Sequence, residues 1–279
     1  MTPVPLVALD LDRTLIYSRA AFALGPPPAT EELVVVERDG AGRPMSYLTA
    51  GGVTALAALA GAATVVPTTT RGTAQYARVV VPGWTPRYAV TANGGEILVG
   101  GEPDLAWRAR VRAALDTGSA PYAEVAAHVA AVAEAPWCAK FREVHGLFCY
   151  LVVDRPALPP TVSADLAAWT ARRRWQVSLQ GRKLYVVPQP LTKSAAVAEI
   201  AARTGATTLL AAGDSLLDAE LLEAADAAVR PAHGELHDTG YYRPHLHITR
   251  TPGVHAAEEL LRWLHTSATS PGLVSPRRG

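Results

Sequence analysis

The chain has 279 residues, of which 49% are hydrophobic and 18% charged, and its formal net charge is +1. This composition predicts a folded protein with a sizeable core and argues against a disordered chain. A nearly neutral chain offers no general attraction for nucleic acid or an anionic membrane. Because we find neither a signal-peptide pattern nor an apolar run of ~18 residues, we expect a cytoplasmic protein whose Cys138 and Cys149 are free thiols.

The first predicted element is an apolar strand over residues 4–10, and two carboxylates, Asp10 and Asp12, stand at its end. Side chains at positions i and i+2 of a strand share a face, so both acids can point into the crevice at the carboxyl edge of a sheet. Such a pair suits a magnesium phosphoryl-transfer site, where one carboxylate attacks phosphorus and binds the metal while the other moves a proton.

A β-hairpin is predicted over residues 33–49, because a turn sequence rich in Gly and Asp separates two short strand-like runs. This hairpin could cover the site of the two acids. A helix at about 51–60 and a strand at 63–67 follow, and the strand leads to Thr69. The Thr69 hydroxyl can donate to a phosphoryl oxygen, although taken alone it would more simply be a threonine that ends a strand.

The composition changes at Pro82-Gly83-Trp84 and changes back near Pro188. Between these points we expect helices near 105–116, 121–134 and 164–174 and strands at 147–153 and 175–187. The sequence therefore predicts a small α+β module over residues 82–187, inserted into a core made of residues 1–81 and 188–265. Residues 266–279 are rich in Ser, Thr, Pro, Gly and Arg and are expected to be disordered.

The returning core is expected to contain a helix at 193–204, a strand at 207–212 and a helix at 217–225. Lys193 stands at the start of the first helix, where the helix dipole disfavours a cation. A lysine in such a place is most often a solvated surface residue, but the unfavourable placement suggests an acidic partner. The strand ends at Asp214, with Asp218 four residues later. Four carboxylates near one another repel unless a cation sits among them, and an oxygen-rich site suits Mg²⁺.

These segments carry a resemblance. The strand-terminal Asp10-Leu11-Asp12-Arg13-Thr14, Thr69, Lys193 and the segment Gly213–Asp218 resemble, in this order, the four motifs of the haloacid dehalogenase (HAD) superfamily. The inserted module, the segment Leu184–Pro188 and the turn Ala92-Asn93-Gly94-Gly95 are similar to subfamily IIB. That branch includes Cof-type phosphatases, sucrose-phosphate phosphatases and phosphomannomutases. The resemblance implies an α/β fold with a Rossmann-like core, a parallel sheet and an inserted α+β cap of the C2 type.

The resemblance also implies roles for individual residues. Asp10 would be the nucleophile and Asp12 the general acid and base, while Thr69 and Lys193 would hold phosphoryl oxygens. Mg²⁺ would be bound by Asp10, the backbone carbonyl of Asp12, Asp214 and Asp218, the last directly or through water. The residues expected to contact the substrate are Thr69, Arg71, Asn93, Gly94, Lys140, Arg142 and Lys193.

Of these residues, Lys140 and Arg142 flank a strand-like segment of the cap together with His145, and solvated positions at a strand edge are the simpler interpretation of all three. Two positions depart from the family pattern. Arg13 stands where the family commonly has Gly, and its side chain either narrows the pocket or points away from it, of which we favour the second. Pro231 stands where related proteins often have Asn, so phosphate contacts there are expected to differ.

The function that the resemblance implies is hydrolysis of a small phosphomonoester with Mg²⁺, through an aspartyl-phosphate on Asp10. The substrate would be a small phosphorylated metabolite, a sugar phosphate first and a nucleotide-like compound next. Two alternatives remain open: a phosphotransferase or phosphomutase of the same fold, and a catalytically silent phosphate-binding protein. We expect no nucleic-acid or membrane partner, and a monomer or small homo-oligomer. The pair His245 and His247 and the run Arg172–Arg174 are expected to lie on the surface rather than to bind zinc or nucleic acid.

Overall fold

The structure, a computed structural model, describes residues 4–270. Its core is a five-stranded sheet, parallel throughout, with the first strand between two later ones. In sheet order the strands are β15 (Leu246–Ile248), β14 (Ala227–Arg230), β13 (Leu209–Ala212), β1 (Leu6–Leu9) and β5 (Thr64–Pro67). The strands expected at 4–10, 63–67 and 207–212 are therefore confirmed.

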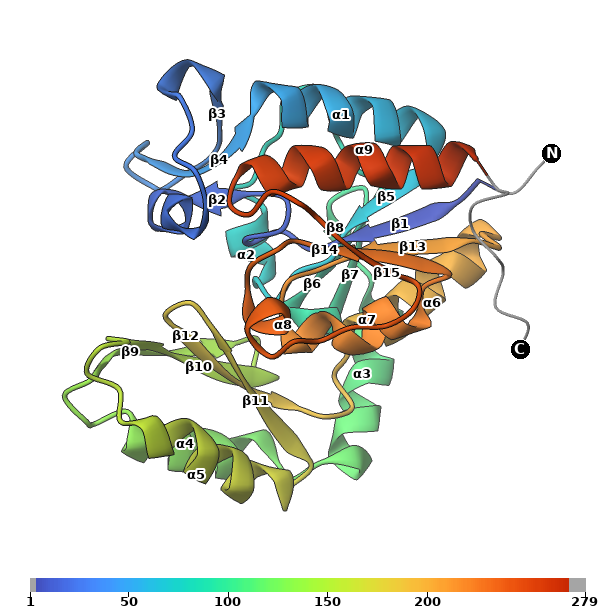
Figure 1. Cartoon of the computed structure of the whole chain (residues 1–279). Coiled ribbons are helices and arrows are strands. Elements are labelled where there is room, and N and C mark those ends of the chain that lie inside the picture. The colour runs from blue at the N-terminus through green and yellow to red at the C-terminus, as the bar shows by residue number, and fades with distance from the viewer. Residues whose placement is uncertain (1–3, 271–279) are drawn as a thin grey trace.

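Helices cover both faces of this sheet, as an all-parallel sheet requires (Figure 1). Val7 and Leu9 pack in the cluster that holds helices α1 (Ala50–Ala62) and α9 (His255–Thr269). Leu6 and Ala8, which alternate with them, pack in the cluster of α6 (Lys193–Thr204) and α7 (Ala219–Ala224). Alternate side chains of a strand point to opposite faces, so β1 is apolar at every position.

The predicted hairpin is formed by β3 (Leu33–Arg38) and β4 (Pro44–Thr49), and β2 (Tyr17–Ser18) joins it to make a small sheet. At its turn, Asp39 Oδ1 accepts hydrogen bonds from the backbone of Ala41 and Arg43 at 2.9 and 3.0 Å. The pairing of the two strands is irregular on both sides of Glu37. The 3-10 helices η1 (Arg19–Leu24) and η2 (Thr30–Glu32) connect β2 to β3.

The segment after residue 82 packs with the core. The short helix α2 (Thr73–Tyr76) precedes this segment. The segment itself contains β6 (Tyr88–Thr91), η3 (Ala92–Gly94), β7 (Glu96–Val99), β8 (Glu102–Pro103) and α3 (Leu105–Gly118). Val90 bridges to Thr68 in parallel, and Tyr88, Val90 and Ile97 are buried in the same cluster as Leu6. We therefore propose that the inserted domain begins after α3 rather than at residue 82.

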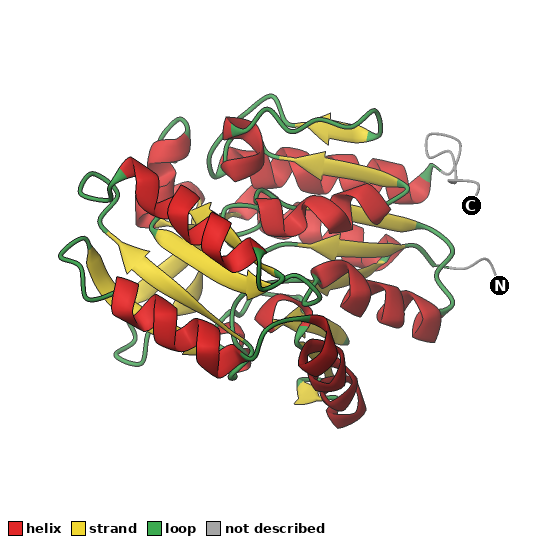
Figure 2. Ribbon diagram, turned by 90° about the horizontal axis from the view of Figure 1, so that it is seen from below, coloured by secondary structure: helices red, strands yellow, loops and turns green. Residues whose placement is uncertain are grey.

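The cap is an antiparallel sheet ordered β11 (Trp175–Gln180), β12 (Lys183–Pro188), β10 (Phe148–Val153) and β9 (Cys138–Val144). Helices α4 (Tyr122–Val132) and α5 (Pro160–Ala171) cover the face that points away from the core, as Figures 1 and 2 show. The single strand predicted at 175–187 is in fact a hairpin, because the chain turns at Gly181, which has a positive φ of 58°.

The C-terminal part of the core also contains the 3-10 helix η4 (Leu216–Asp218) and α8 (Glu235–Asp238). Helix α9 runs to Thr269, so residues 266–269 of the predicted tail are helical, and residues 271–279 lie outside the described part. Cys138 and Cys149 are free, as expected. Within residues 4–270, none of the helices combines the length and the apolar character that crossing a membrane requires.

Candidate active site

Three acids meet at the carboxyl edge of the core sheet. Asp10 follows β1, Asp214 follows β13, and Asp218 ends η4 just beyond. One carboxylate oxygen of each lies within 4.8 Å of the others, and all three residues are buried. The parallel topology explains this meeting, because the carboxyl ends of neighbouring parallel strands share one edge.

Lys193, the first residue of α6, lies between two of these acids. Its Nζ is 2.6 Å from Asp10 Oδ1 and 2.5 Å from Asp218 Oδ1, and its side chain is 1% exposed. The side chain of Thr192 caps the same helix by accepting a hydrogen bond from Ala195 N. The acidic partner expected from the unfavourable helix position of Lys193 is therefore present.

The charges of this group do not balance. Burial raises the pKa of Asp10, and repulsion from Asp218 adds to the shift, although Lys193 opposes it. Burial and the charges of Asp10 and Asp218 also raise the pKa of Asp214 well above its ordinary value. Three carboxylates beside one ammonium leave an excess of negative charge in a buried place. Oxygen donors of this kind are the ligands that Mg²⁺ prefers, so the residues fit that ion.

The carboxylate of Asp12 turns away from this group and pairs with Arg71. Arg71 Nε and Nη2 each donate to one Asp12 oxygen at 2.8 Å, a bidentate arrangement. Burial opposes ionisation of Asp12, but the charges of Arg71 and Lys183 outweigh it and lower the pKa of Asp12 below its ordinary value. Binding of a metal by the backbone carbonyl of Asp12, which the family resemblance implies, stays a prediction.

Arg71 has a second acidic partner. Its Nη1 lies 2.9 Å from Glu37 Oε1 on the hairpin, and both side chains are buried. Glu37 also accepts hydrogen bonds from Ser46 Oγ at 2.6 Å and from Arg78 Nη2 at 3.1 Å. Arg71 was predicted to contact the substrate, but the structure places its guanidinium between two carboxylates of the protein itself.

Thr69 follows β5, the neighbour of β1 in the core sheet, whereas the turn at Asn93 contacts the segment just before α6. Thr69 is buried, and its Oγ1 accepts a hydrogen bond from Arg71 N at 3.1 Å, which leaves the hydroxyl hydrogen to donate. Asn93 Nδ2 donates to Leu191 O at 2.8 Å. Gly94, with φ 97°, packs so closely on the carbonyl of Thr192 that a side chain would overlap it. The turn thus supports the start of α6 and contributes no charged group to the site.

The segment His233-Gly234-Glu235 takes part in the site and was missed by the sequence analysis. His233 Nδ1 accepts from Gly253 N at 3.0 Å, so its Nε2 donates to the carbonyl of Arg13 at 2.8 Å. Burial lowers the pKa of His233 to about 4, so the ring is neutral. Gly234, with φ 89°, lies against Asp214, where a side chain would overlap the carboxylate. The one sequence signal was that this segment follows Pro231, a position that departs from the family pattern.

Polar contacts hold the cap against the core. Tyr185 Oη accepts from Thr70 Oγ1 at 3.2 Å, and His145 Nε2 accepts from Thr73 N at 3.2 Å. Glu235 of the core accepts hydrogen bonds from the cap residues Ser178 (Oγ) and Leu179 (N) at 2.6 and 2.8 Å. The cap is therefore closed over the acids in this structure.

Lys140 and Arg142 lie on the edge strand β9 and are exposed. Arg142 pairs directly with Tyr150, so the two side chains share a face of the cap sheet. That face points toward the core, because Gln75 Nε2 of the core donates to Tyr150 Oη at 3.4 Å. Within residues 4–270, Lys140 and Arg142 form no ion pair, and their contact with a substrate stays a prediction.

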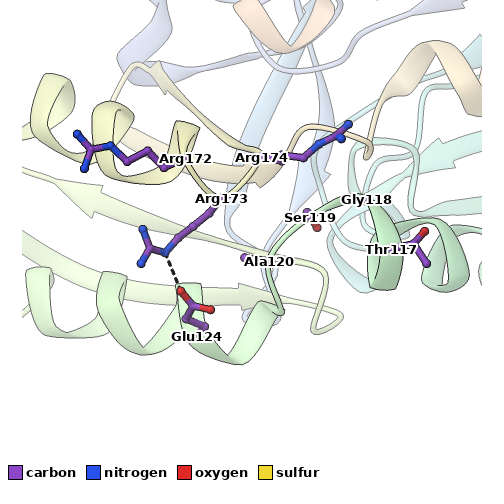
Figure 3. A pocket seen from close by; sticks show the side chains of 8 residues that line it. All are labelled: Thr117, Gly118, Ser119, Ala120, Glu124, Arg172, Arg173 and Arg174. Carbon is purple, nitrogen blue, oxygen red and sulfur yellow. Dashed lines mark hydrogen bonds and ion pairs between the residues drawn. The ribbon is translucent and has the colours of Figure 1, made fainter.

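The basic run and the histidine pair lie elsewhere. A depression of about 420 Å³ on the cap, shown in Figure 3, is lined by Thr117–Ala120, Glu124 and Arg172–Arg174. Arg173 in this depression pairs with Glu124 at 2.7 Å and stacks over Trp169 at 3.7 Å. His245 Nε2 bonds to the carbonyl of Leu222, whereas His247 stacks on Trp263. Within residues 4–270, Asp10, Asp214 and Asp218 form the one group that could hold a metal.

Comparisons with known proteins establish the fold. No protein-family model matches the chain, and no curated protein matches it in sequence. Among solved structures, the sucrose-phosphatase from Synechocystis sp. PCC6803 in complex with sucrose and phosphate is 18% identical, with a TM-score of 0.64 over 95% of this chain and 98% of that one. A HAD subclass IIB sugar phosphatase is 14% identical, with a TM-score of 0.57 over 95% and 99%.

A third similar structure is the C-terminal domain of the trehalose-6-phosphate phosphatase from C. albicans, which is 12% identical with a TM-score of 0.53 over 94% of this chain and 92% of that one. These likenesses span both the core and the cap. The chain therefore has the fold of HAD subclass IIB phosphatases, an α/β core with a parallel sheet and an inserted cap, as the sequence resemblance predicted.

Proposed function

We propose that the chain is a Mg²⁺-dependent phosphatase that hydrolyses a small phosphomonoester through an aspartyl-phosphate on Asp10. The observation that carries the proposal is the buried group of Asp10, Asp214, Asp218 and Lys193, which lies at the carboxyl edge of the sheet beneath the cap. Carboxylates in this number need a cation, and phosphoryl transfer needs a nucleophile beside positive charge.

Asp10, Asp214, Asp218 and the backbone carbonyl of Asp12 would hold the Mg²⁺. When bound, the ion supplies positive charge that offsets the oxygens of the transferring phosphoryl group. Asp218 is already oriented for this task, because its Oδ2 accepts hydrogen bonds from Ser215 N at 3.0 Å and Ser215 Oγ at 2.7 Å. Lys193 opposes protonation of Asp10 and gives the phosphoryl oxygens a fixed cation.

In the first step, a carboxylate oxygen of Asp10 attacks phosphorus, and the bond between phosphorus and the leaving oxygen breaks. Asp12 gives a proton to that oxygen, and Thr69 donates a hydrogen bond to a phosphoryl oxygen. In the second step, Asp12 takes a proton from water while the water oxygen attacks phosphorus. The bond from Asp10 to phosphorus then breaks, and inorganic phosphate leaves.

The ion pair of Asp12 with Arg71 favours one of these two roles. A bidentate guanidinium stabilises the ionised carboxylate, which is the form that accepts a proton from water. Protonation of Asp12 for the first step must work against this pair. We therefore expect cleavage of poor leaving groups, rather than hydrolysis of the aspartyl-phosphate, to limit turnover.

A sugar phosphate is the proposed substrate. The similar structures include a sucrose-phosphatase, a trehalose-6-phosphate phosphatase and a sugar phosphatase, and each matches this chain over its core and its cap. The cap covers the acids and brings tyrosines and a lysine toward the core, which suits a polar leaving group.

Release of inorganic phosphate from a panel of phosphorylated metabolites, with and without Mg²⁺, tests the proposal. We expect the chelated enzyme to be inactive, Mg²⁺ to restore it, and Asp10→Asn to abolish release while the fold persists. Asp116→Asn, which changes an exposed acid on α3, is the matched control. Phosphate release without an added acceptor distinguishes a hydrolase from a phosphotransferase. Unchanged turnover after chelation, or in Asp10→Asn, would contradict the proposal.

A further inference from the structure

Arg13 adopts a backbone conformation that its side chain disfavours. Its φ is 65°, in the left-handed region where Gly is preferred, and Gly is common here in the family that the sequence resembles. His233 Nε2 donates a hydrogen bond to the carbonyl of Arg13, which fixes the local backbone. A strained non-glycine residue beside a reactive Asp is a reason to look for a function of its side chain.

The guanidinium of Arg13 reaches the cap. It lies against Gly181 in the turn between β11 and β12, where any side chain at position 181 would overlap it. Within residues 4–270 the Arg13 side chain forms no hydrogen bond or ion pair, unlike the Arg71 side chain. Its positive charge thus lies where the core meets the cap. The same charge opposes the rise in the pKa of Asp214, but within the described residues no acid forms an ion pair with Arg13. Whether the Arg13 side chain faces the pocket or points away from it stays a prediction.

A second cation stands beside the same turn. Lys183 is the first residue of β12, and its Nζ lies 5.8 Å and 6.0 Å from the ring centroids of Tyr150 and Tyr185. It forms no ion pair in the described part of the chain. The positive charge of Lys183 helps to lower the pKa of Asp12, the proposed acid and base. Lys183 therefore lies on the side of the site where Asp12 would meet the leaving group.

The face of the cap sheet that carries Lys183 also carries Lys140 and Arg142, and the described strands add no acid to it. Residues paired directly across an antiparallel sheet share a face, and here Lys140 and Lys183 both pair with Val152. Arg142, which pairs with Tyr150, lies on the same face. The one acid of these strands, Glu143, pairs with Cys149 on the other face and accepts a hydrogen bond from Tyr122. Glu235, which approaches from the core, is already engaged by Ser178 and Leu179.

We propose that Arg13 and Lys183 form a second anion subsite, and that the substrate is a phosphomonoester whose leaving group carries a negative charge of its own, a carboxylate or a further phosphoryl group. This inference rests on the proposed phosphatase function. Lys193 and the metal would offset the negative charge of the transferring phosphoryl group. That group therefore does not explain why the positive charges of Arg13 and Lys183 stand here. An anionic leaving group that bridges the core and the cap would pair with both cations and would be bound only when the cap is closed.

The test compares kcat/KM for four phosphomonoesters in the presence of Mg²⁺. 3-Phosphoglycerate carries a carboxylate, fructose 1,6-bisphosphate carries a second phosphoryl group, glucose 6-phosphate has a neutral leaving group, and 4-nitrophenyl phosphate is a small aryl ester. We expect one of the two anionic substrates to exceed glucose 6-phosphate by about 10-fold or more, since a charged hydrogen bond is worth that factor. Which of the two does so identifies the kind of anion.

Lys183→Met should remove this advantage, lowering kcat/KM for the preferred anionic substrate by about 10-fold more than it lowers kcat/KM for glucose 6-phosphate and 4-nitrophenyl phosphate. Lys183→Arg should retain most of it, and Arg13→Gly should reduce it while relieving the strained backbone. Arg182→Met is the matched control, because it removes one positive charge from an exposed residue of the same turn.

Three outcomes would overturn the subsite. Equal kcat/KM for charged and neutral leaving groups would do so while leaving the phosphatase proposal intact, provided that 4-nitrophenyl phosphate is hydrolysed. An equal loss in Lys183→Met and Arg182→Met would show only a general effect of charge. Absence of phosphate release from all four compounds would overturn the phosphatase function and the subsite with it.

Discussion

Glu37 should affect catalysis although it lies on the hairpin and not at the edge of the core sheet. It is joined to Asp12 through Arg71, with distances of 2.9 Å from Glu37 to Arg71 and 2.8 Å from Arg71 to Asp12. Glu37→Gln keeps the shape of the side chain and removes its charge. Arg71 then loses one of two carboxylates in a buried place, and its guanidinium is free to rotate away from the bidentate arrangement.

The magnitude follows from the burial of these groups. Breaking a buried ion pair by removing one partner costs roughly 3–5 kcal/mol. We expect about 3 kcal/mol of unfolding free energy here, the lower end of that range, because Arg71 keeps Asp12 and Arg78 is 41% exposed and can turn to water. Displacing a group that transfers protons by about 1 Å costs on the order of 100-fold in rate, so kcat for a poor leaving group should fall by about 10- to 100-fold.

The assay compares a sugar phosphate with 4-nitrophenyl phosphate, and measures unfolding by urea. 4-Nitrophenolate leaves without a proton, so its release should depend much less on Asp12 than release of a sugar does. Glu32→Gln, an exposed acid just before the hairpin, is the control and should change neither quantity. If Glu37→Gln lowers kcat equally for both substrates, or lowers stability with no change in kcat, Glu37 does not position Asp12.

Further predictions concern Lys193, Gly234 and the metal-free protein. Lys193→Met should lower kcat by about 100-fold or more, as for loss of one preorganised charge in an active site. Mg²⁺ should raise the melting temperature of this variant more than that of the wild type. Equal increases in the two melting temperatures would contradict the pairing of Lys193 with the acids. Gly234→Ala should weaken Mg²⁺ binding in a titration followed by activity, because the added methyl group would overlap the Asp214 carboxylate. In the presence of a chelator, the free energy of unfolding should fall as pH rises from about 4 to about 7. Burial raises the pKa of Asp10 to about 7, so over this interval the native state holds a proton that the unfolded chain has released. Mg²⁺ should reduce this loss, and a stability that rises over the same pH interval without metal would contradict the sign.

Asp10 and Asp214 were predictable because each stands at the end of an apolar strand, and Asp218 because it follows Asp214 by four residues. Asp10 and Asp214 follow strands that the hydrophobic pattern identifies, and a parallel sheet brings such ends to one edge. Lys193 was predictable for the opposite reason, since a cation at a helix start is unfavourable unless acids surround it. These features depend on chain order and burial, which the sequence pattern reports directly.

The pairing of Arg71 with Glu37 was not predictable. It depends on an irregular register beside Glu37 in β3, which no periodic pattern indicates. The hairpin of β11 and β12 was mistaken for one strand because its turn at Gly181 lacks an Asn-Gly or Asp-Gly signal. As a result, the sequence did not single out Lys183, and the contact of Lys140 and Arg142 with a substrate stays a prediction. The contact of Arg13 with Gly181 joins segments far apart in the chain and has no local signature.

The central claim is that Asp10 becomes phosphorylated, and a rapid-quench experiment tests it most directly. The enzyme is mixed with Mg²⁺ and a good substrate, quenched in acid within a single turnover, digested and examined by mass spectrometry. The account predicts a phosphoryl group on the peptide that contains Asp10, absent in Asp10→Asn and absent when Mg²⁺ is chelated before mixing. Turnover with no phosphoryl group on that peptide at any quench time, or with one on a different residue, would contradict the account.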